Sequence, residues 1–479
     1  MKTRLSLALA TLFALSCIHT VHEDPRPPVT LPEAFAQGSG GEVGADRWWE
    51  AFQDPELNRI VEKALEGNLE MFGAWARIDQ ANAIAIQARS AWYPNLSANA
   101  DYGYNRSVFF AGDLGKLEQE THNYNLGLGM SYEVDIWGKI KSMVDASDRD
   151  VEATRQDLES MAMTLVAQVT EVWFSLVEME AQMDLLQRQI EINRTYRDLV
   201  EARFGQGMAT ALDVFQQRQQ VEAVRAQMPQ VEAGLHVLRH QLAVLLGKPP
   251  SEKVAHVSKI LPVPPPLPTT GLPADVIGNR PDVKSAQLRV VSTDHRIGMA
   301  KKDMLPSFRL NFNVGFTAQD ITQLFDNWIF GLGAGLLAPL LDGGRRLAEV
   351  DRVIAQRLEL IGRYGQVVLN ALKEVEDALV QERKQLEYLE GLQGQLDVVR
   401  SALEVARDRY AGGLIDYLPV LTALQSVQAI ERSELTARRQ ALSYRIQLCR
   451  AIGGDWTGEL ERPEPPYEKD PAEQAGEGQ

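Results

Sequence analysis

The chain has 479 residues and a formal net charge of −16 at neutral pH, and this surplus of acid disfavours nucleic-acid binding by bulk attraction. Hydrophobic residues make up 45% of the sequence, which is enough for a packed core. Only two cysteines are present, so an internal disulfide framework is not expected to stabilise the chain. We therefore expect no nucleic-acid partner and expect stability to come from packing and assembly.

The N-terminus has the layout of an export signal. Two basic residues precede an apolar stretch at 5–15, which is too short to span a membrane as a mature helix. The sequence FALSC that ends at Cys17 is similar to a lipobox, in which the cysteine becomes the acylated first residue. We predict a signal peptide over 1–16 and a lead-in over 17–46 that is lipidated at Cys17. Plain cleavage beside an incidental cysteine is the alternative.

Four stretches alternate between apolar and polar residues, as strands with two differently solvated faces do. In YNLGLGMSYEVDIWG, residues 124–138, one parity is apolar and the other is mostly Gly, Asn and acid. Hairpins are predicted over 94–136 and 306–342. Their strands exceed the usual five or six residues and reach the roughly 9–11 that a tilted transmembrane strand needs. The alternative is a soluble sandwich with one wet face.

An open four-stranded sheet is excluded in lipid, because every backbone group there must be paired. Small barrels start at about eight strands. The strands therefore favour an oligomer without fixing its number. In this reading Tyr124 to Val134 present apolar side chains to lipid and Gly127, Gly129, Ser131 and Glu133 face a wet lumen.

Two very long helices follow the hairpins, at 138–204 and 345–411. From Lys139 to Phe204 the sequence has neither glycine nor proline, so a rise of 1.5 Å per residue gives roughly 100 Å of helix. Apolar residues at three- and four-residue spacing predict a packing stripe of the coiled-coil kind. Because each long helix begins where a membrane strand ends, the helices are expected to extend the barrel as a tunnel. A solid bundle without a lumen would leave the sheet unexplained.

The sequence is a tandem repeat. RFGQGMATALDVFQQ at 203–217 and RYAGGLIDYLPVLTA at 409–423 align without a gap. Each copy begins with a helix, predicted at 55–92 and at 281–304, and continues through a hairpin, a long helix, a turn and a further helix. The predicted organisation is a first repeat at 47–250, a Pro-rich linker at 251–280, a second repeat at 281–456 and a disordered tail at 457–479.

Each long helix ends at a tight turn, which we call a tip. Four glycines permit the chain to reverse there. They are Gly205, Gly207, Gly412 and Gly413. Thr210 and Asp213 are predicted to cap the outgoing helix of the first tip. The tips lie farthest from the membrane, where a duct must open, close and contact a partner; that the glycines are simply turn residues is compatible with this.

Several motifs resemble the TolC/OprM/NodT outer-membrane factors, which are channel subunits of tripartite efflux and secretion systems. They are WWEAFQDPELNRIVEKALEGN, YEVDIWGKIK, LDGGRR and RYAGGLIDYLPVL, together with the duplicated layout over about 45–460. The resemblance implies a homotrimer with a twelve-stranded barrel in the outer membrane of a Gram-negative bacterium and a helical tunnel through the periplasm. It also implies outer-membrane lipid, a periplasmic adaptor and an inner-membrane pump as partners, with neither enzymatic activity nor a cofactor.

The resemblance also implies a periplasmic gate just after the second tip. It places an apolar ring at Leu418, whereas the position of the family's gate aspartate is occupied by Thr422. Nearby polar candidates are Asp416, Tyr417 and Asp213. We therefore expect a mainly apolar constriction at Leu418 in place of a cation-binding gate.

These features predict a mainly α-helical protein with a membrane β-barrel sector that passively conducts cargo to the exterior. The alternatives are the duct of a type I protein secretion system and a lipid-anchored periplasmic scaffold that conducts nothing. His236 and His240 have the i, i+4 spacing of metal ligands, but no third ligand accompanies them, so no metal site is expected. No nucleophile–base pattern predicts a catalytic site.

Overall fold

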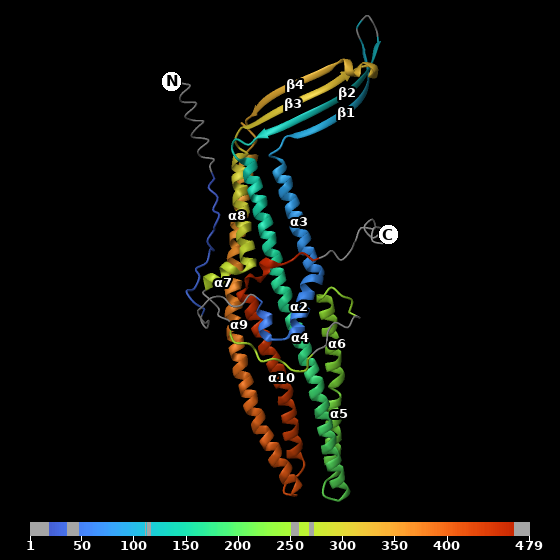
Figure 1. Ribbon diagram of the computed structural model, residues 1–479, viewed down its shortest axis with the longest axis vertical. Coiled ribbons are helices and arrows are strands. Elements are labelled where there is room, and N and C mark those ends of the chain that lie inside the picture. Colours follow the sequence, from blue (N-terminus) through green and yellow to red (C-terminus); the bar gives the residue numbers. More distant parts are fainter. Residues whose placement is uncertain are drawn as a thin grey trace. The chain divides into compact units, whose positions relative to one another are not determined.

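The computed structural model describes residues 19–35, 47–110, 112, 116–250, 258–267 and 273–463. The predicted signal peptide and Cys17 lie outside the described residues. The chain is mainly helical and contains a four-stranded sheet, which confirms the predicted fold class (Figure 1). Its contacts define two compact units. Unit one comprises Met1–Pro28, Arg77–Arg155 and Ser285–Gly365, and unit two comprises Val29–Ala76, Gln156–Lys284 and Gln366–Gln479.

Unit one contains the sheet. Its strands are β1 (Asn95–Phe110), β2 (Lys116–Val134), β3 (Ser307–Ala318) and β4 (Trp328–Leu337), and a short 3-10 helix, η3 (Ile321–Asp326), joins the last two. The strands pair antiparallel in the order β1-β2-β3-β4 (Figure 1). Both predicted hairpins therefore belong to one sheet, because β2 pairs with β3 across the two sequence repeats.

Four helices belong to unit one over part of their length. They are α3 (Leu69–Ser90), α4 (Lys139–Gly205), α8 (Pro281–Lys302) and α9 (Arg345–Ala411). Buried Ala88, Ile140 and Val144 pack α3 against α4. Trp137 Nε1 donates to Pro306 O over 2.8 Å, which joins the turn after β2 to the turn before β3. The strand-to-helix connections are thus held by specific contacts.

Unit two contains the remaining parts of these helices and the shorter elements. The latter are η1 (Trp48–Phe52), α2 (Pro55–Gly67), α5 (Ala211–Arg225), α6 (Met228–Leu245), α7 (Pro273–Asn279), α10 (Leu418–Ile452) and η4 (Asp455–Glu459). One helix of the described chain, α4, contains a window apolar enough to cross a membrane, but 67% of that window is buried within the protein. Such burial is typical of a core helix.

The helix predicted over 55–92 is two helices. Asn68 separates α2 from α3, and its side-chain oxygen accepts hydrogen bonds from Glu70 N and Met71 N. A Cβ on Gly67 would lie 2.8 Å from the carbonyl oxygen of Leu246, so the chain passes too close to its neighbour here for a larger residue. The helix is therefore interrupted by the close approach of the Gly67 and Leu246 backbones and by the Asn68 cap at the start of α3.

Two predicted boundaries differ from the structure. The predicted disordered tail, 457–479, begins too early, because Asp455–Glu459 form η4 and Trp456 packs edge-on against Trp49 with ring centroids 4.9 Å apart. The predicted linker, 251–280, contains helix α7, which starts at a proline, a residue favoured in the first helical turn. Its extended part is held by Arg445, which pairs with Glu382 and donates to Pro266 O over 2.8 Å.

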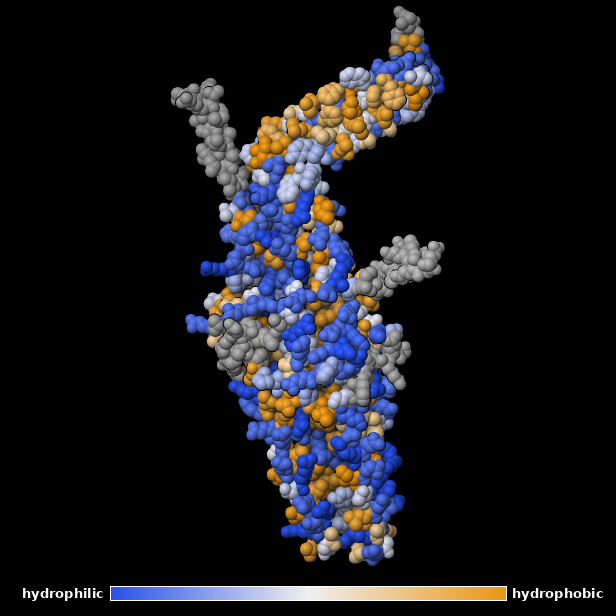
Figure 2. Space-filling model, viewed as in Figure 1, coloured by the Kyte–Doolittle hydropathy of each residue, from blue (hydrophilic) through white to orange (hydrophobic). Residues whose placement is uncertain are grey.

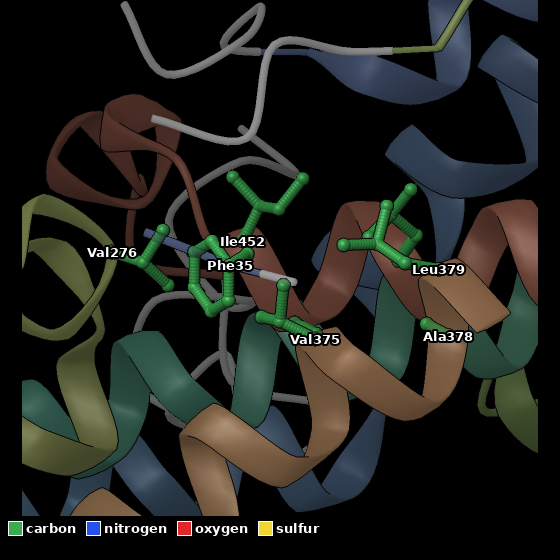
Figure 3. Packing of buried hydrophobic residues seen from close by; sticks show 8 residues of the cluster. Phe35, Val276, Val375, Ala378, Leu379 and Ile452 are labelled. Atoms are coloured by element: carbon green, nitrogen blue, oxygen red, sulfur yellow. The ribbon is translucent and has the colours of Figure 1, made fainter. Parts of the chain in front are cut away.

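A buried apolar cluster of unit two includes Phe35, which lies in the segment before η1 (Figure 3). It comprises Phe35, Val276, Val375, Ala378, Leu379, Leu448, Ala451 and Ile452. The Phe35 ring lies between α7, α9 and α10 residues in this cluster. Burying one aromatic side chain is worth about 1.5–3 kcal/mol, so this contact ties the segment before η1 to the helices.

Candidate functional site

One face of the sheet is apolar across all four strands. The register aligns apolar residues with one another, as in the row Leu96, Met130, Phe312 and Leu332. Leu96 is 68% exposed and Leu332 is 73% exposed, and Figure 2 shows apolar residues gathered over the visible face of the sheet. An exposed apolar surface along strands of this length matches the lipid-facing side of a membrane barrel.

The opposite face carries amides and glycines. Its rows include Ser97, Gly129, Asn313 and Gly331. A Cβ on Gly331 would lie 2.3 Å from Asn313 Oδ1, and one on Gly127 would lie 2.9 Å from Asn99 Oδ1. The glycines therefore leave the space into which asparagine side chains of the neighbouring strands extend. The result is a polar wall that is mostly uncharged.

The sheet has two open edges among the described strands, because β1 pairs only with β2 and β4 pairs only with β3. Unpaired backbone groups at an edge cost several kcal/mol each in hydrocarbon, at order of magnitude. A lipid-facing sheet with two such edges needs strands from further chains.

A charged network marks the passage from strands to helices. Glu133 and Arg309 are direct neighbours on the polar face of β2 and β3, with 3.5 Å between charged atoms. Lys139 at the start of α4 pairs with Glu133, and Asp303 after α8 lies 3.1 Å from Arg346 of α9. These groups are partly exposed, so each pair contributes little stability. Their place on the same side as the asparagines shows that the polar surface continues onto the helices.

The two tips have the same backbone geometry. Gly207 and Gly413 adopt positive φ values of 75° and 72°, and the next residue at each tip donates to a carbonyl five residues earlier. These bonds are Met208 N to Arg203 O, 2.8 Å, and Leu414 N to Arg409 O, 2.9 Å. The other two predicted glycines, Gly205 and Gly412, lack a positive φ. A left-handed residue is thus required at one position per tip.

The predicted cap of the first tip is confirmed. Thr210 N donates to Asp213 Oδ2 over 2.8 Å, and Asp213 N donates to Thr210 Oγ1 over 3.2 Å. This is a capping box at the start of α5. The carboxylate of Asp213 is therefore occupied by the cap.

The predicted gate residues of the second tip lie at the start of α10. Leu418 is the first residue of α10 and is 55% exposed. Thr422, one turn later on the same side of the helix, is exposed, as is Asp416. Tyr417, in contrast, is only 1% exposed. It therefore contributes to the packing behind the exposed residues.

Tyr417 begins a buried polar cluster, which we call the amide network. Its members are Tyr417, Gln217, Asn193, Gln428, Gln189 and Gln220. Tyr417 Oη donates to Gln217 Oε1 over 2.6 Å, and Gln217 Nε2 donates to Asn193 O over 2.8 Å. Asn193 Nδ2 donates to Gln428 Oε1 over 3.1 Å. The amide network joins the hairpin of α4 and α5 to the start of α10 through neutral groups.

Burial raises the pKa of Tyr417, and the neighbouring groups Tyr196, Tyr410 and Asp213 raise it further. The phenol therefore stays protonated as a hydrogen-bond donor. Sequence reasoning missed this network because glutamine and asparagine on a long helix resemble a solvated face. A local signal was present. Leu186, Gln189, Asn193, Tyr196 and Val200 continue the alternating three- and four-residue spacing of the buried stripe.

No group of three histidine, cysteine or acidic residues in the described part of the chain could hold a metal ion. The rings of His236 and His240 are 6.5 Å apart. Cys449 is buried, and burial raises its pKa to about 12, so its thiol remains protonated and unreactive at neutral pH.

Comparison with known proteins connects these features. A family model described as outer membrane efflux protein matches residues 60–248 and 272–454. The pyoverdine export outer membrane protein OpmQ of Pseudomonas putida is 27% identical over 90% of this chain and 94% of its own length. The probable outer membrane lipoprotein SilC of Salmonella typhimurium is 27% identical over 94% of this chain and 98% of its own.

Solved structures give the same result. The outer-membrane channel OprN superposes with a TM-score of 0.84 at 26% identity, covering 92% of this chain and 100% of the other. CusC superposes with a TM-score of 0.83 at 22% identity, covering 91% of this chain and 100% of the other. The latter likeness concerns the fold.

Proposed function

The chain belongs to the outer membrane efflux protein family, and from that premise we propose that three copies close a twelve-stranded barrel. It is an outer-membrane channel of an efflux system, with a periplasmic extension, and it is not an enzyme. The observation that supports the oligomer is the sheet with one uniformly apolar face and two open edges. Three copies would pair every edge strand and leave the asparagine wall around a common lumen.

The partners of the duct are a periplasmic adaptor and an inner-membrane pump. Family members act in tripartite systems, and the tips are the parts of this chain suited to adaptor contact. Among the adaptor-contacting residues we include Gly205, Gly207, Gly412 and Gly413. The relatives are named for different cargoes, which are pyoverdine for OpmQ, toluene for TtgF and cations for CusC. A passive duct accepts what its pump delivers, so the pump determines the cargo.

The constriction of the duct is an apolar ring at Leu418. Support comes from its exposure at the first position of α10 and from the exposed Thr422 one turn later. Tyr417 acts as a positioning residue, since the amide network fixes the backbone directly before Leu418. Asp416 remains a polar lining candidate, whereas Asp213 contributes by capping α5.

Cys17 carries the lipid anchor. The lipobox-like sequence and the relative SilC, described as a probable lipoprotein, support this assignment. The first repeat, 47–250, and the second, 281–456, represent a duplication whose copies meet where β2 pairs with β3.

Conductance in planar bilayers tests the proposed duct and gate together. The purified oligomer should give discrete conductance steps, and Leu418→Ala should enlarge them or lengthen their open time because a bulky apolar side chain is removed from the narrowest point. Leu414→Ala, which removes an exposed leucine side chain of the same tip outside the predicted gate, is the matched control. Unchanged conductance in Leu418→Ala would place the constriction elsewhere. An oligomer that never conducts would favour the scaffold.

A further inference from the structure

The segment that follows the lipidation position is docked onto the helices of unit one. Residues 19–24 contact α4 and α8. The polar groups of this segment that make contacts are His19, His22, Glu23 and Asp24. An extended segment without secondary structure stays in place only when specific contacts offset the entropy of ordering it.

The central contact is a buried carboxylate. Asp294 of α8 has a side chain that is only 2% exposed, and both of its oxygens face the N-terminal segment. His19 Nε2 lies 2.9 Å from Oδ1, and His22 N donates to Oδ2 over 2.8 Å. His22 Nδ1 lies 3.4 Å from the same Oδ2. The opposite charge comes from Arg357 of α9, whose Nε is 3.1 Å from Oδ1.

These partners explain why a charge can remain buried here. Burial by itself would raise the pKa of Asp294, but the hydrogen bonds from His22 N and His19, together with the charge of Arg357, lower it below the ordinary value. A buried carboxylate that loses such partners is strongly disfavoured. Oδ2 accepts from His22 N and lies close to His22 Nδ1, so the N-terminal segment supplies the partners of this oxygen.

Both ring nitrogens of His19 have a partner in the site. Its Nε2 faces the carboxylate, and its Nδ1 lies 3.4 Å from Lys301 Nζ. The Nε2–H tautomer donates to Asp294 and accepts from the lysine ammonium, so both ring nitrogens are matched.

Further contacts continue along the segment. Arg149 of α4 donates to Glu23 over 3.0 Å, and His295 of α8 lies 3.3 Å from the same carboxylate. Gln287 Nε2 of α8 donates to Asp24 Oδ1 over 2.7 Å. The segment therefore runs antiparallel to α8, with His19 near Lys301 and Asp24 near Gln287.

This direction brings the start of the segment to the sheet end of α8. Helix α8 ends at Lys302 and β3 begins at Ser307. Cys17 precedes His19 by two residues, a reach of about 7 Å at most. We propose that Asp294 is a docking site for the chain's own N-terminal segment and that it holds the lipid attachment residue beside the membrane end of α8. The placement of the lipid rests on the lipidation proposed above, whereas the docking does not.

Hydrogen–deuterium exchange on the full-length oligomer in nanodiscs tests the docking. The His22 amide reports directly, because it donates to Asp294. Asp294→Ala should raise the exchange rate of residues 19–24 by about tenfold or more, as expected for loss of hydrogen bonds to a charged group. His19→Ala with His22→Ala removes both imidazoles but keeps the His22 N donor, so it should raise the exchange rate by a smaller factor. Asp150→Asn is the matched control, since it removes the ion pair of Asp150 with Arg296 between α4 and α8 without touching the segment.

Unchanged exchange in the histidine variant would overturn the docking site even if Asp294→Ala fails to fold. A photo-crosslinking amino acid at residue 18 tests the placement. It should label the last turn of α8 in the unmodified protein and lose that label in Asp294→Ala. Equal labelling in both proteins would overturn the placement. The mass of the N-terminal peptide shows independently whether Cys17 is acylated, so failure of lipidation is distinguishable from failure of docking.

Discussion

The hydroxyl of Tyr417 is expected to stabilise the closed tip. Tyr417→Phe removes one oxygen atom and keeps the ring in its apolar surroundings of Val200, Val214, Val420 and Leu421. It leaves Gln217 Oε1 without the hydroxyl that donates to it over 2.6 Å. Gln217 is fully buried, so water cannot replace this bond unless the helices move.

The magnitude follows from that burial. A buried acceptor that loses its partner costs about 1–3 kcal/mol. If the cost falls on the closed tip and is relieved when the tip opens, the ratio of open to closed states should rise by about five- to 150-fold. The change should appear without a large loss of thermal stability, because the ring and its contacts remain.

The assay is open probability in planar bilayers, with Tyr410→Phe as the matched control. The Tyr410 ring lies 5.3 Å from that of Tyr417, but its hydroxyl has no hydrogen-bond partner among the described residues. Removing the Tyr410 hydroxyl should leave the open probability unchanged. The phenylalanine ring keeps the cation–π contact with Arg203, whose guanidinium carbon lies 4.5 Å from the Tyr410 ring centroid. Combining Tyr417→Phe with Gln217→Leu removes the unmet acceptor but also the donor to Asn193 O, so it should restore the closure only in part.

Two results would refute this reasoning. Equal leak in the Tyr417 and Tyr410 variants would show that the tip responds to any lost hydroxyl. No leak in Tyr417→Phe, with the protein folded, would show that the amide network does not hold the constriction.

Three further predictions concern other parts of the molecule. Thr210→Ala removes the cap of α5 and should cost about 1 kcal/mol, seen as faster amide exchange in the first turn; unchanged exchange would contradict the capping box. Gly315→Ala places a Cβ 2.9 Å from the carbonyl oxygen of Leu126, so the oligomer should dissociate at a lower temperature, at a cost of about 1–3 kcal/mol. Gly333→Ala adds a Cβ that has no atom within 4 Å, so it should leave the dissociation temperature unchanged. Equal effects of the two substitutions would argue against the close strand contact. The pKa of Asp294 is lower in the folded protein than the unfolded value of about 3.9, so its carboxylate stabilises the fold at higher pH. This stabilisation is lost as pH falls through the lower folded pKa. The stability difference from Asp294→Asn should therefore shrink as pH falls below about 4, and a difference that stays undiminished there would refute it.

The sequence was informative where structure depends on local periodicity. Alternation in 124–138 predicted the two faces of β2 because side chains of a strand point to opposite sides at every residue. Thr210 and Asp213 were likewise predicted to cap α5, because a cap involves only residues within one turn, and the structure shows the reciprocal bonds of a capping box.

Features that depend on distant residues were not predictable in this way. Tyr417 was predicted as a polar candidate near the gate, yet it is buried because Gln217 lies opposite, 200 residues earlier. The docking of His19 depends on Asp294, which is 275 residues away in the chain. The break at Asn68 was missed although its signal is local, because the apolar spacing continues through it.

The oligomer purified from the outer membrane tests the central claim most directly. Its mass in nanodiscs and its conductance in planar bilayers should be measured on the same preparation. We predict discrete conductance steps from a closed oligomer, because only closed pairing of the β1 and β4 edges satisfies the backbone in lipid, and we predict three chains because that is the oligomer proposed from the family. A monomer that is extracted without detergent and conducts nothing would contradict the account.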